Sequence, residues 1–275
     1  LDGGSGSDNL SSRSLSGDHT LIGSYGSDTL TATGKTVSLD GGEDNDNLYA
    51  YGYIDKEGSR SYLEDGTATL IGGNGNDTIR AEYYETNTVQ AGDGDDRIEF
   101  YSSGIVDVAA GDGNDNVNES ESQKSVIKGG AGDDNIYSYE SNNVNLKGGN
   151  GDDYIYSSIY QNPWTNNSKG DLNNNYILDE TTSHKLNGGT GDDTLKVYGD
   201  STRLQYGNNE IEVIGGAGND TIDITDNNAG STSNTNGNEY GIASVKIDGG
   251  DGKDEITVSG GLDVSITTGA DSDTV

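Results

Sequence analysis

AGDGDDRI at residues 91–98, AGDGNDNV at residues 110–117 and GGAGDDNI at residues 129–136 are copies of one turn motif, spaced 19 residues apart. The fullest copies read G-G-x-G-[N or D]-D-x-U, where U is aliphatic. The first six positions are called slots one to six: slot one is the first glycine and slot six is the aspartate that precedes x-U. Twelve copies occupy the chain, and slot six is always an aspartate: Asp8, Asp28, Asp46, Asp77, Asp96, Asp115, Asp134, Asp153, Asp193, Asp220, Asp254 and Asp273. A recurring period of this length is typical of a solenoid.

The composition argues against an ordinary globular core. Only 29% of the 275 residues are hydrophobic, there is one Phe and one Trp, and the formal net charge is −33. Such a chain repels itself and buries too little apolar surface to offset the entropy of folding. We therefore expect bound cations to neutralise it, and we expect no nucleic-acid partner. The absence of cysteine excludes disulfides and thiolate metal sites.

Aliphatic residues occupy two fixed places around each motif. Two positions before slot one stand Leu1, Leu21, Leu39, Leu70, Val89, Val108, Ile127, Leu146, Leu186, Val213, Ile247 and Ile266. Two positions after slot six stand Leu10, Leu30, Leu48, Ile79, Ile98, Val117, Ile136, Ile155, Leu195, Ile222, Ile256 and Val275. Alternation continues from several of them, which indicates short strands with one buried face. We predict an all-β parallel β-roll or β-solenoid: two short parallel sheets, with the glycine turns along one edge.

The predicted organisation is a single roll over residues 1–275 with about 12 coils, because each coil needs neighbours to bury its aliphatic residues. Polar, Asn-, Ser- and Gly-rich segments near 156–184, 198–210 and 224–242 are expected to be loop insertions. The interval of 40 residues between Asp153 and Asp193 allows two interpretations, a long loop or a degenerate extra coil. The chain both begins and ends on a motif, so we expect a fragment of a longer protein.

The turn chemistry favours calcium. Glycines can direct several backbone carbonyls to one place, and the slot-six aspartate adds a carboxylate, so the site is all oxygen. Calcium takes six to eight oxygen ligands in flexible geometry, whereas Mg²⁺ requires a tighter octahedron and Zn²⁺ prefers His or Cys. With two His and no Cys in the chain, calcium is the best match.

These turns resemble the G-G-x-G-x-D-x-U-x nonapeptide of RTX (repeats-in-toxin) proteins, and the resemblance extends over nearly the whole chain. It implies a parallel β-roll in which each calcium ion lies between successive turns, bound by slot-six aspartates and by main-chain carbonyls. The implied carbonyls include those of Gly3, Gly72, Gly129, Gly148, Gly188, Gly215 and Gly249. It also implies folding on calcium after export to the cell surface or the medium.

The chain departs from the usual RTX pattern in one respect. The second turn of each coil, such as YYETNT at residues 83–88, lacks the motif. We therefore predict one ladder of at most about 11 calcium ions along one edge, similar in layout to the 19-residue repeats of large RTX adhesins.

Individual slots also vary. Asp44 and Asp271 replace glycine at slot four and Ser24 replaces it at slot two, where positive φ is harder to hold. The slot-five acids Asp95, Asp133, Asp152 and Asp192 are expected to face solvent and only to raise the local negative field.

Tyrosines recur at outward positions after the motif: Tyr51, Tyr101, Tyr139 and Tyr198 at the fifth position after slot six, and Tyr49, Tyr137 and Tyr156 at the third. We interpret them as good strand formers on a solvent-facing surface. The alternative is a surface that stacks on sugar rings or on another protein.

Three other features were weighed. Residues 171–175 resemble the start of a helix-loop calcium site, but Tyr176 and Thr182 stand where that loop needs Gly and Glu. His19 and His184 have no evident acid–base partner and are expected to be surface or strand residues. Neither H-E-x-x-H nor G-x-S-x-G occurs, so we predict no catalytic residues.

Two functions fit these expectations. The first is a calcium-folded structural or interaction segment of an extracellular bacterial surface protein, an adhesin or surface-layer type, which could contact polysaccharide or another surface protein through its outer face or loops. The alternative is an accessory module of a secreted enzyme or toxin whose catalytic part lies outside this chain. No apolar segment approaches the length of a membrane span, so membrane insertion is not expected.

Overall fold

The computed structural model describes residues 1–14, 17–56, 59–62, 65–159, 182–199, 210–226, 242, 244–261 and 263–275. The described residues form strands and turns without a helix, and therefore without a helix that could cross a membrane. The chain divides into two units, unit 1 at Leu1–Ile136 and unit 2 at Tyr137–Val275.

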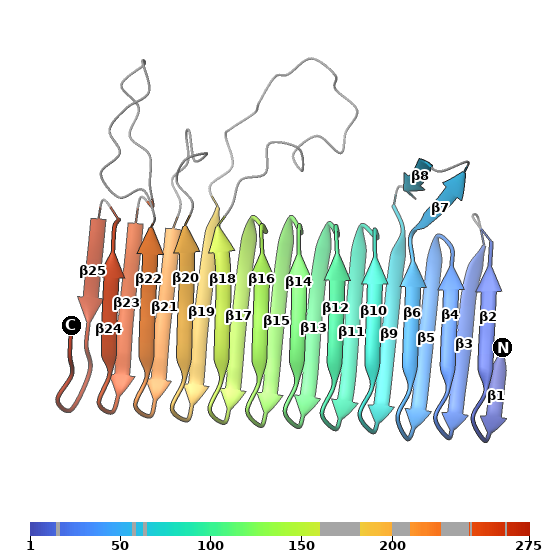
Figure 1. Cartoon of the computed structure of the whole chain (residues 1–275), viewed down its shortest axis with the longest axis horizontal. Coiled ribbons are helices and arrows are strands. Elements are labelled where there is room, and N and C mark those ends of the chain that lie inside the picture. The colour runs from blue at the N-terminus through green and yellow to red at the C-terminus, as the bar shows by residue number, and fades with distance from the viewer. Residues whose placement is uncertain are drawn as a thin grey trace, which may run out of the picture. The chain divides into compact units, whose positions relative to one another are not determined.

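Unit 1 contains two parallel sheets (Figure 1). The first has the order β1 (Asp2–Ser5), β3 (Asp18–Tyr25), β5 (Thr36–Glu43), β9 (Thr67–Asn74), β11 (Thr86–Asp93), β13 (Ile105–Asp112) and β15 (Lys124–Ala131). The second has the order β2 (Asn9–Arg13), β4 (Thr29–Thr33), β6 (Asn47–Tyr51), β10 (Thr78–Glu82), β12 (Arg97–Tyr101) and β14 (Asn116–Ser120). A separate antiparallel pair, β7 (Tyr53–Lys56) and β8 (Ser59–Tyr62), is inserted between β6 and β9.

Unit 2 repeats the arrangement. One sheet has the order β17 (Asn143–Asn150), β19 (Ser183–Thr190), β21 (Glu210–Ala217), β23 (Ser244–Asp251) and β25 (Asp263–Thr267). The other has the order β18 (Tyr154–Ile159), β20 (Thr194–Gly199), β22 (Thr221–Asp226) and β24 (Glu255–Ser259). Strand β16 (Asn135–Tyr139) includes the boundary between the units. The predicted all-β parallel roll is confirmed.

The aliphatic residues that frame the motif form the core. In β13, for example, buried and exposed residues alternate, and Val106 and Val108 are at most 1% exposed. Successive coils align them in register, as Val89 pairs with Val108 and Val108 with Ile127. The only framing residues that are largely exposed lie at the chain ends, Leu1 and Val275. The core is thus a row of thin layers, each closed by its neighbours.

The strands reach further into the motif than the sequence predicted. Slots one to three belong to the strand that enters the turn, as in β13, which ends at Asp112. The turn itself consists of slots four to six, and β14 begins at Asn116. The turn is therefore shorter than the six-slot motif, because slots two and three still make parallel sheet pairs, Gly111 with Gly130 and Asp112 with Ala131.

Strands β18 to β22 extend into the ends of the three predicted insertions. The remaining parts, residues 160–181, 200–209 and 227–241, lie outside the described residues. The helix-loop-like segment at Asp171, Asn173 and Asn175 falls there too. The interval of 40 residues adds no extra coil to the stack, since β17 pairs directly with β19 and β18 with β20.

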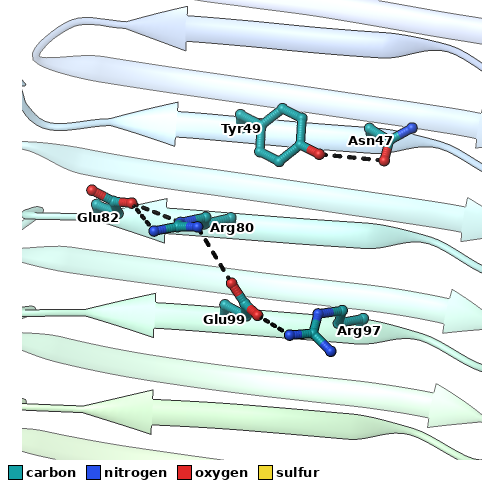
Figure 2. A network of polar contacts seen from close by, with 6 residues as sticks. All are labelled: Asn47, Tyr49, Arg80, Glu82, Arg97 and Glu99. Atoms are coloured by element: carbon teal, nitrogen blue, oxygen red, sulfur yellow. Dashed lines mark hydrogen bonds and ion pairs between the residues drawn. The ribbon is translucent and has the colours of Figure 1, made fainter.

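The outer face of unit 1 carries polar contacts (Figure 2). Arg80 on β10 pairs with Glu82 on its own strand at 2.5 Å and with Glu99 on β12 at 3.5 Å, and Arg97 also pairs with Glu99. On β6 the hydroxyl of Tyr49 donates a hydrogen bond to Asn47. Ion pairs with an exposed partner contribute little stability, so these surface contacts add little to the stability of the roll.

Both histidines lie in strands, as expected, but neither lies on the surface. His19 is 7% exposed and its Nδ1 lies 2.6 Å from Ser12 Oγ. His184 is fully buried, with Nδ1 2.7 Å from Ser157 Oγ. In both cases the histidine is four residues before slot one and the serine four residues after the preceding slot six, a pair of positions that face each other inside the roll.

His184 makes the stability of unit 2 dependent on pH. Burial lowers its pKa to about 4 from the ordinary 6.5. The unfolded chain therefore takes up this proton near pH 6.5 and the folded chain only near pH 4, so stability present above pH 6.5 is lost as the pH falls through that window. At saturating calcium we expect the Tm of the His184→Val/Ser157→Ala variant to fall less between pH 7 and pH 5 than that of the unchanged chain. Val144 occupies the equivalent position in the adjacent coil.

The matched control is Ser157→Ala alone, which keeps the histidine and should keep the steeper pH dependence. Equal slopes for all three proteins, measured by thermal circular dichroism, would contradict this account.

Candidate metal-binding turns

The motif turns of each unit lie along one edge of that unit. In unit 1 every glycine turn joins a strand of the first sheet to the following strand of the second, at the lower edge in Figure 1. The intervening turns, such as residues 83–85 and 102–104, join the second sheet back to the first at the opposite edge. Unit 2 has the same connections. The expected placement of the motif on one edge is confirmed for each unit.

Positive φ angles build the turn. Gly111 at slot two has φ +131°, and its missing Cβ would come within 1.9 Å of the Gly92 carbonyl oxygen of the preceding coil. The three departures from the motif adopt the same region, with φ 84° at Ser24, 74° at Asp44 and 77° at Asp271. Their turns therefore keep the shape of the others, at the cost of backbone strain.

The slot-six aspartates form a continuous ladder inside each unit. The backbone N–H of each aspartate donates to Oδ1 of the next, for example from Asp96 to Asp115 and from Asp115 to Asp134, both at 2.8 Å. The same bond runs from Asp8 to Asp134 through unit 1 and from Asp153 to Asp273 through unit 2, at 2.7–3.1 Å. One oxygen of each accepting carboxylate is thereby used to position the side chain.

The second carboxylate oxygen is left without a partner. Ten of the twelve ladder aspartates are at most 2% exposed: Asp28, Asp46, Asp77, Asp96, Asp115, Asp134, Asp153, Asp193, Asp220 and Asp254. The Oδ2 atoms of Asp8, Asp28, Asp46, Asp77, Asp96, Asp115, Asp193, Asp220 and Asp254 are buried and receive no hydrogen bond from the described residues. A buried carboxylate oxygen without a donor is costly, so a row of them indicates a missing positive partner.

Backbone carbonyls face these oxygens. A Cβ built on Gly188 would lie 2.2 Å from Asp193 Oδ2 and 2.6 Å from the carbonyl oxygen of Gly215, so both oxygens border the same small space. The same relation holds for Asp46 with the Gly72 carbonyl and for Asp220 with the Gly249 carbonyl. The carbonyls of Gly41, Ala91 and Thr268 are placed likewise against Asp28, Asp77 and Asp254. Those of Gly3, Gly129, Gly148 and Gly188 stay predicted ligands.

Burial raises the pKa of the ladder carboxyls. The pKa rises from 3.8 to about 7 for Asp96, Asp115, Asp134 and Asp193, and to about 6 for Asp46, Asp77 and Asp220. Desolvation is the largest cause; the hydrogen bond from the preceding amide lowers the pKa, and neighbouring carboxylates raise it further. A nearby cation acts in the opposite direction, because it favours the ionised form.

Slot five forms a second ladder that the sequence did not predict. The N–H of Asp95 donates to Asn76 Oδ1, that of Asn114 to Asp95 Oδ1, and that of Asp133 to Asn114 Oδ1. Asp152 and Asp192 take part in the same way in unit 2. These acids are exposed, as expected, but they do more than raise the field, because they bond successive turns. The signal was the restriction of slot five largely to Asn and Asp.

The donor set fits a hard cation. Among the described residues, no group of three His, Cys, Asp or Glu side chains converges in the way an all-side-chain metal site requires. Six turns, those of Asp28, Asp46, Asp77, Asp193, Asp220 and Asp254, instead offer one unpartnered carboxylate oxygen beside a carbonyl oxygen of the next coil. All-oxygen ligands of this mixed kind suit calcium, whereas Zn²⁺ prefers nitrogen and sulfur.

Comparison with known families agrees with this chemistry. The model of the RTX calcium-binding nonapeptide repeat (4 copies) matches residues 22–52, 63–82, 85–99, 125–144, 140–158 and 212–223. No curated protein and no solved structure matches the chain.

Proposed function

Because the chain carries RTX calcium-binding nonapeptide repeats, we propose that its slot-six aspartates hold calcium between successive turns and that this binding folds the roll. The observation that supports the proposal best is the row of buried, unpartnered Oδ2 atoms, each fixed by a hydrogen bond to the other oxygen of the same carboxylate. Carbonyl oxygens of the next coil would complete the sites. Within each unit, the first and the last turn of the ladder have an adjacent turn on one side only.

The charge supports the same proposal. The net charge is −33, and the ladder brings carboxylates of successive coils close enough to raise one another's pKa. Calcium supplies positive charge at these oxygens when it is bound. A ligand that binds the folded chain and not the unfolded chain adds its binding free energy to folding.

We further propose that the segment serves a bacterial surface protein, where a calcium concentration sufficient for folding exists outside the cell. In that setting the roll is a structural element, and its outer faces and opposite edge are available for contacts. Sequencing the gene on both sides of the segment tests this proposal: a flanking hydrolase or toxin domain would favour the accessory-module alternative.

The ligand assignment predicts a difference between slots six and five. Asp115→Asn keeps the Oδ1 that accepts the Asp96 N–H but replaces the unpartnered Oδ2 by an amide that cannot bind a cation. We expect this variant to bind one or two fewer calcium ions per chain and to fold at a higher calcium concentration. Calorimetric titration, with circular dichroism as the readout of folding, measures both quantities.

Asp95→Asn is the matched control. It makes the same chemical change one slot earlier, at an exposed side chain whose Oδ1 accepts the Asn114 amide. Its calcium stoichiometry should equal that of the unchanged chain. If both variants lose ions equally, slot six is not a special ligand position.

A further inference from the structure

Four tyrosines on the outer face of unit 2 form one continuous aromatic surface, called here the tyrosine patch: Tyr137, Tyr139, Tyr154 and Tyr156. The Tyr137 and Tyr139 rings on β16 are parallel within 2°, with centroids 6.1 Å apart. The β18 rings lie against them, Tyr154 at 5.5 Å from Tyr137 and Tyr156 at 5.4 Å from Tyr139, tilted by about 40°. The period of the coil brings together rings that are well separated in the chain.

The patch has unused hydrogen-bonding capacity. Within the described residues, the four hydroxyl groups have no hydrogen-bond partner. Burial, followed by the neighbouring tyrosines, raises the pKa of Tyr139 and Tyr156, so these hydroxyls stay protonated at neutral pH. By contrast, Tyr49, at the equivalent position of Tyr137 in unit 1, donates its hydroxyl to Asn47 (Figure 2).

The strands of the patch carry no outward acid, although Glu140 follows Tyr139 directly and its N–H donates a hydrogen bond to Ser158 Oγ. The other outward residues of β18 and β20 are Ser158, Thr194, Lys196 and Tyr198, and Lys196 Nζ lies 5.6 Å from the centroid of Tyr154. On β22, Asp223 is in register with Lys196, which is itself in register with Tyr156, so the first outward carboxylate in that row lies two strands away from the patch. The strands of the patch therefore offer a ligand no outward carboxylate. This favours an uncharged ligand over a cation.

The exposed area is small. Tyr139 is 39% exposed and the other three rings are half-buried. With roughly 200 Å² for each tyrosine, the patch exposes at most about 300 Å². A stable protein interface buries about 800 Å² per partner, so neither a second copy of the chain nor another protein matches this patch in size.

We propose that the tyrosine patch binds a neutral polysaccharide. A pyranose ring presents an apolar C–H face, which packs on an aromatic ring, and a rim of hydroxyls, which can accept and donate hydrogen bonds at the tyrosine hydroxyls. Four aromatic rings side by side on two strands suit an extended chain of such sugar rings. This site is on a sheet face and away from the turn edge, so the inference goes beyond calcium binding.

The test is affinity electrophoresis of the full chain in excess calcium, in native gels that contain dextran, mannan, xylan or hydroxyethyl cellulose. We expect at least one polymer to retard the chain. Tyr139→Ala and Tyr156→Ala should each weaken the apparent affinity by about fivefold, and the double variant by more than about tenfold, as expected for removing aromatic contacts. Tyr156→Phe keeps the ring and should stay closer to the unchanged chain.

Tyr49→Ala is the matched control, because it removes an outward tyrosine from an equivalent position outside the patch. It should leave retardation unchanged. Circular dichroism in calcium must show all variants folded, and the exposed Tyr139 is the safer single change. Three outcomes would overturn the proposal: no retardation by any of the four polymers, an equal loss in Tyr49→Ala, or sedimentation showing that the patch instead forms a dimer that Tyr139→Ala disrupts.

Discussion

Excess chelator at pH 7.5 is expected to abolish the β signal of the chain in circular dichroism. Eight ladder aspartates, Asp28, Asp46, Asp77, Asp96, Asp115, Asp193, Asp220 and Asp254, are at most 2% exposed and keep an oxygen without a partner, so without calcium each must be buried as an uncompensated charge or take up a proton. Burying an unpaired charge costs several kcal/mol, and a domain is stable by only about 5–15 kcal/mol in total. The summed cost of burying the ladder carboxylates without a cation therefore exceeds the stability of either unit, and the loss of the β signal should be complete.

The control for this experiment is magnesium. At equal concentration Mg²⁺ supplies the same charge but requires a tighter octahedron and retains its water, so it should not restore the fold. Readdition of calcium should. A β signal that persists in excess chelator would show that the ladder carboxylates are satisfied in some other way, and it would contradict the proposed coupling of calcium to folding.

Much of the fold follows from residues that are readable in the sequence. Val108 and Val117 frame one motif at fixed distances, and both lie buried in the strands that the spacing predicts. What could not be predicted depends on neighbouring coils. In the turns opposite the motif, four residues other than glycine take positive φ, between 48° and 63°: Tyr83, Ser102, Glu121 and Glu140. The parallel pairing on both sides imposes that geometry against the residues' own preference.

The candidate site, too, could be predicted from the sequence only in part. The slot-six aspartates could be identified because a carboxylate recurs beside glycines, and the structure places all of them in the two ladders. The carbonyl oxygens of Ala91 and Thr268 were missed because the expected carbonyls were sought at glycines, although a backbone oxygen does not depend on its side chain. Tyr137, Tyr139 and Tyr156 were identified as outward residues. The slot-five ladder, Tyr154 and the ring contacts between β16 and β18 were missed, because these bonds and contacts join two coils and only the register between coils reveals them.

The stacking of glycines predicts a second large effect, at slot two. Gly111 has φ +131°, and a Cβ there would come within 1.9 Å of the Gly92 carbonyl oxygen. That oxygen belongs to the backbone of the adjacent coil, so it cannot move aside without opening the sheet between β11 and β13. Gly111→Ala therefore combines backbone strain with a steric clash inside a packed stack. We expect a loss of about 3 kcal/mol or more, or failure to fold at calcium concentrations that fold the unchanged chain.

Gly4→Ala separates the two causes. Gly4 occupies slot two of the first coil, has φ +94°, and has nothing within 4 Å of the position where its Cβ would be. In this variant only the unfavourable backbone conformation destabilises the fold, by about 1–2 kcal/mol. It should therefore fold with calcium almost as the unchanged chain does. Calcium titrations followed by circular dichroism compare the folding midpoints. Similar midpoints for Gly4→Ala and Gly111→Ala would mean that the coils can separate enough to admit a methyl group, and the ladder spacing would then not be set by contact between glycine backbones.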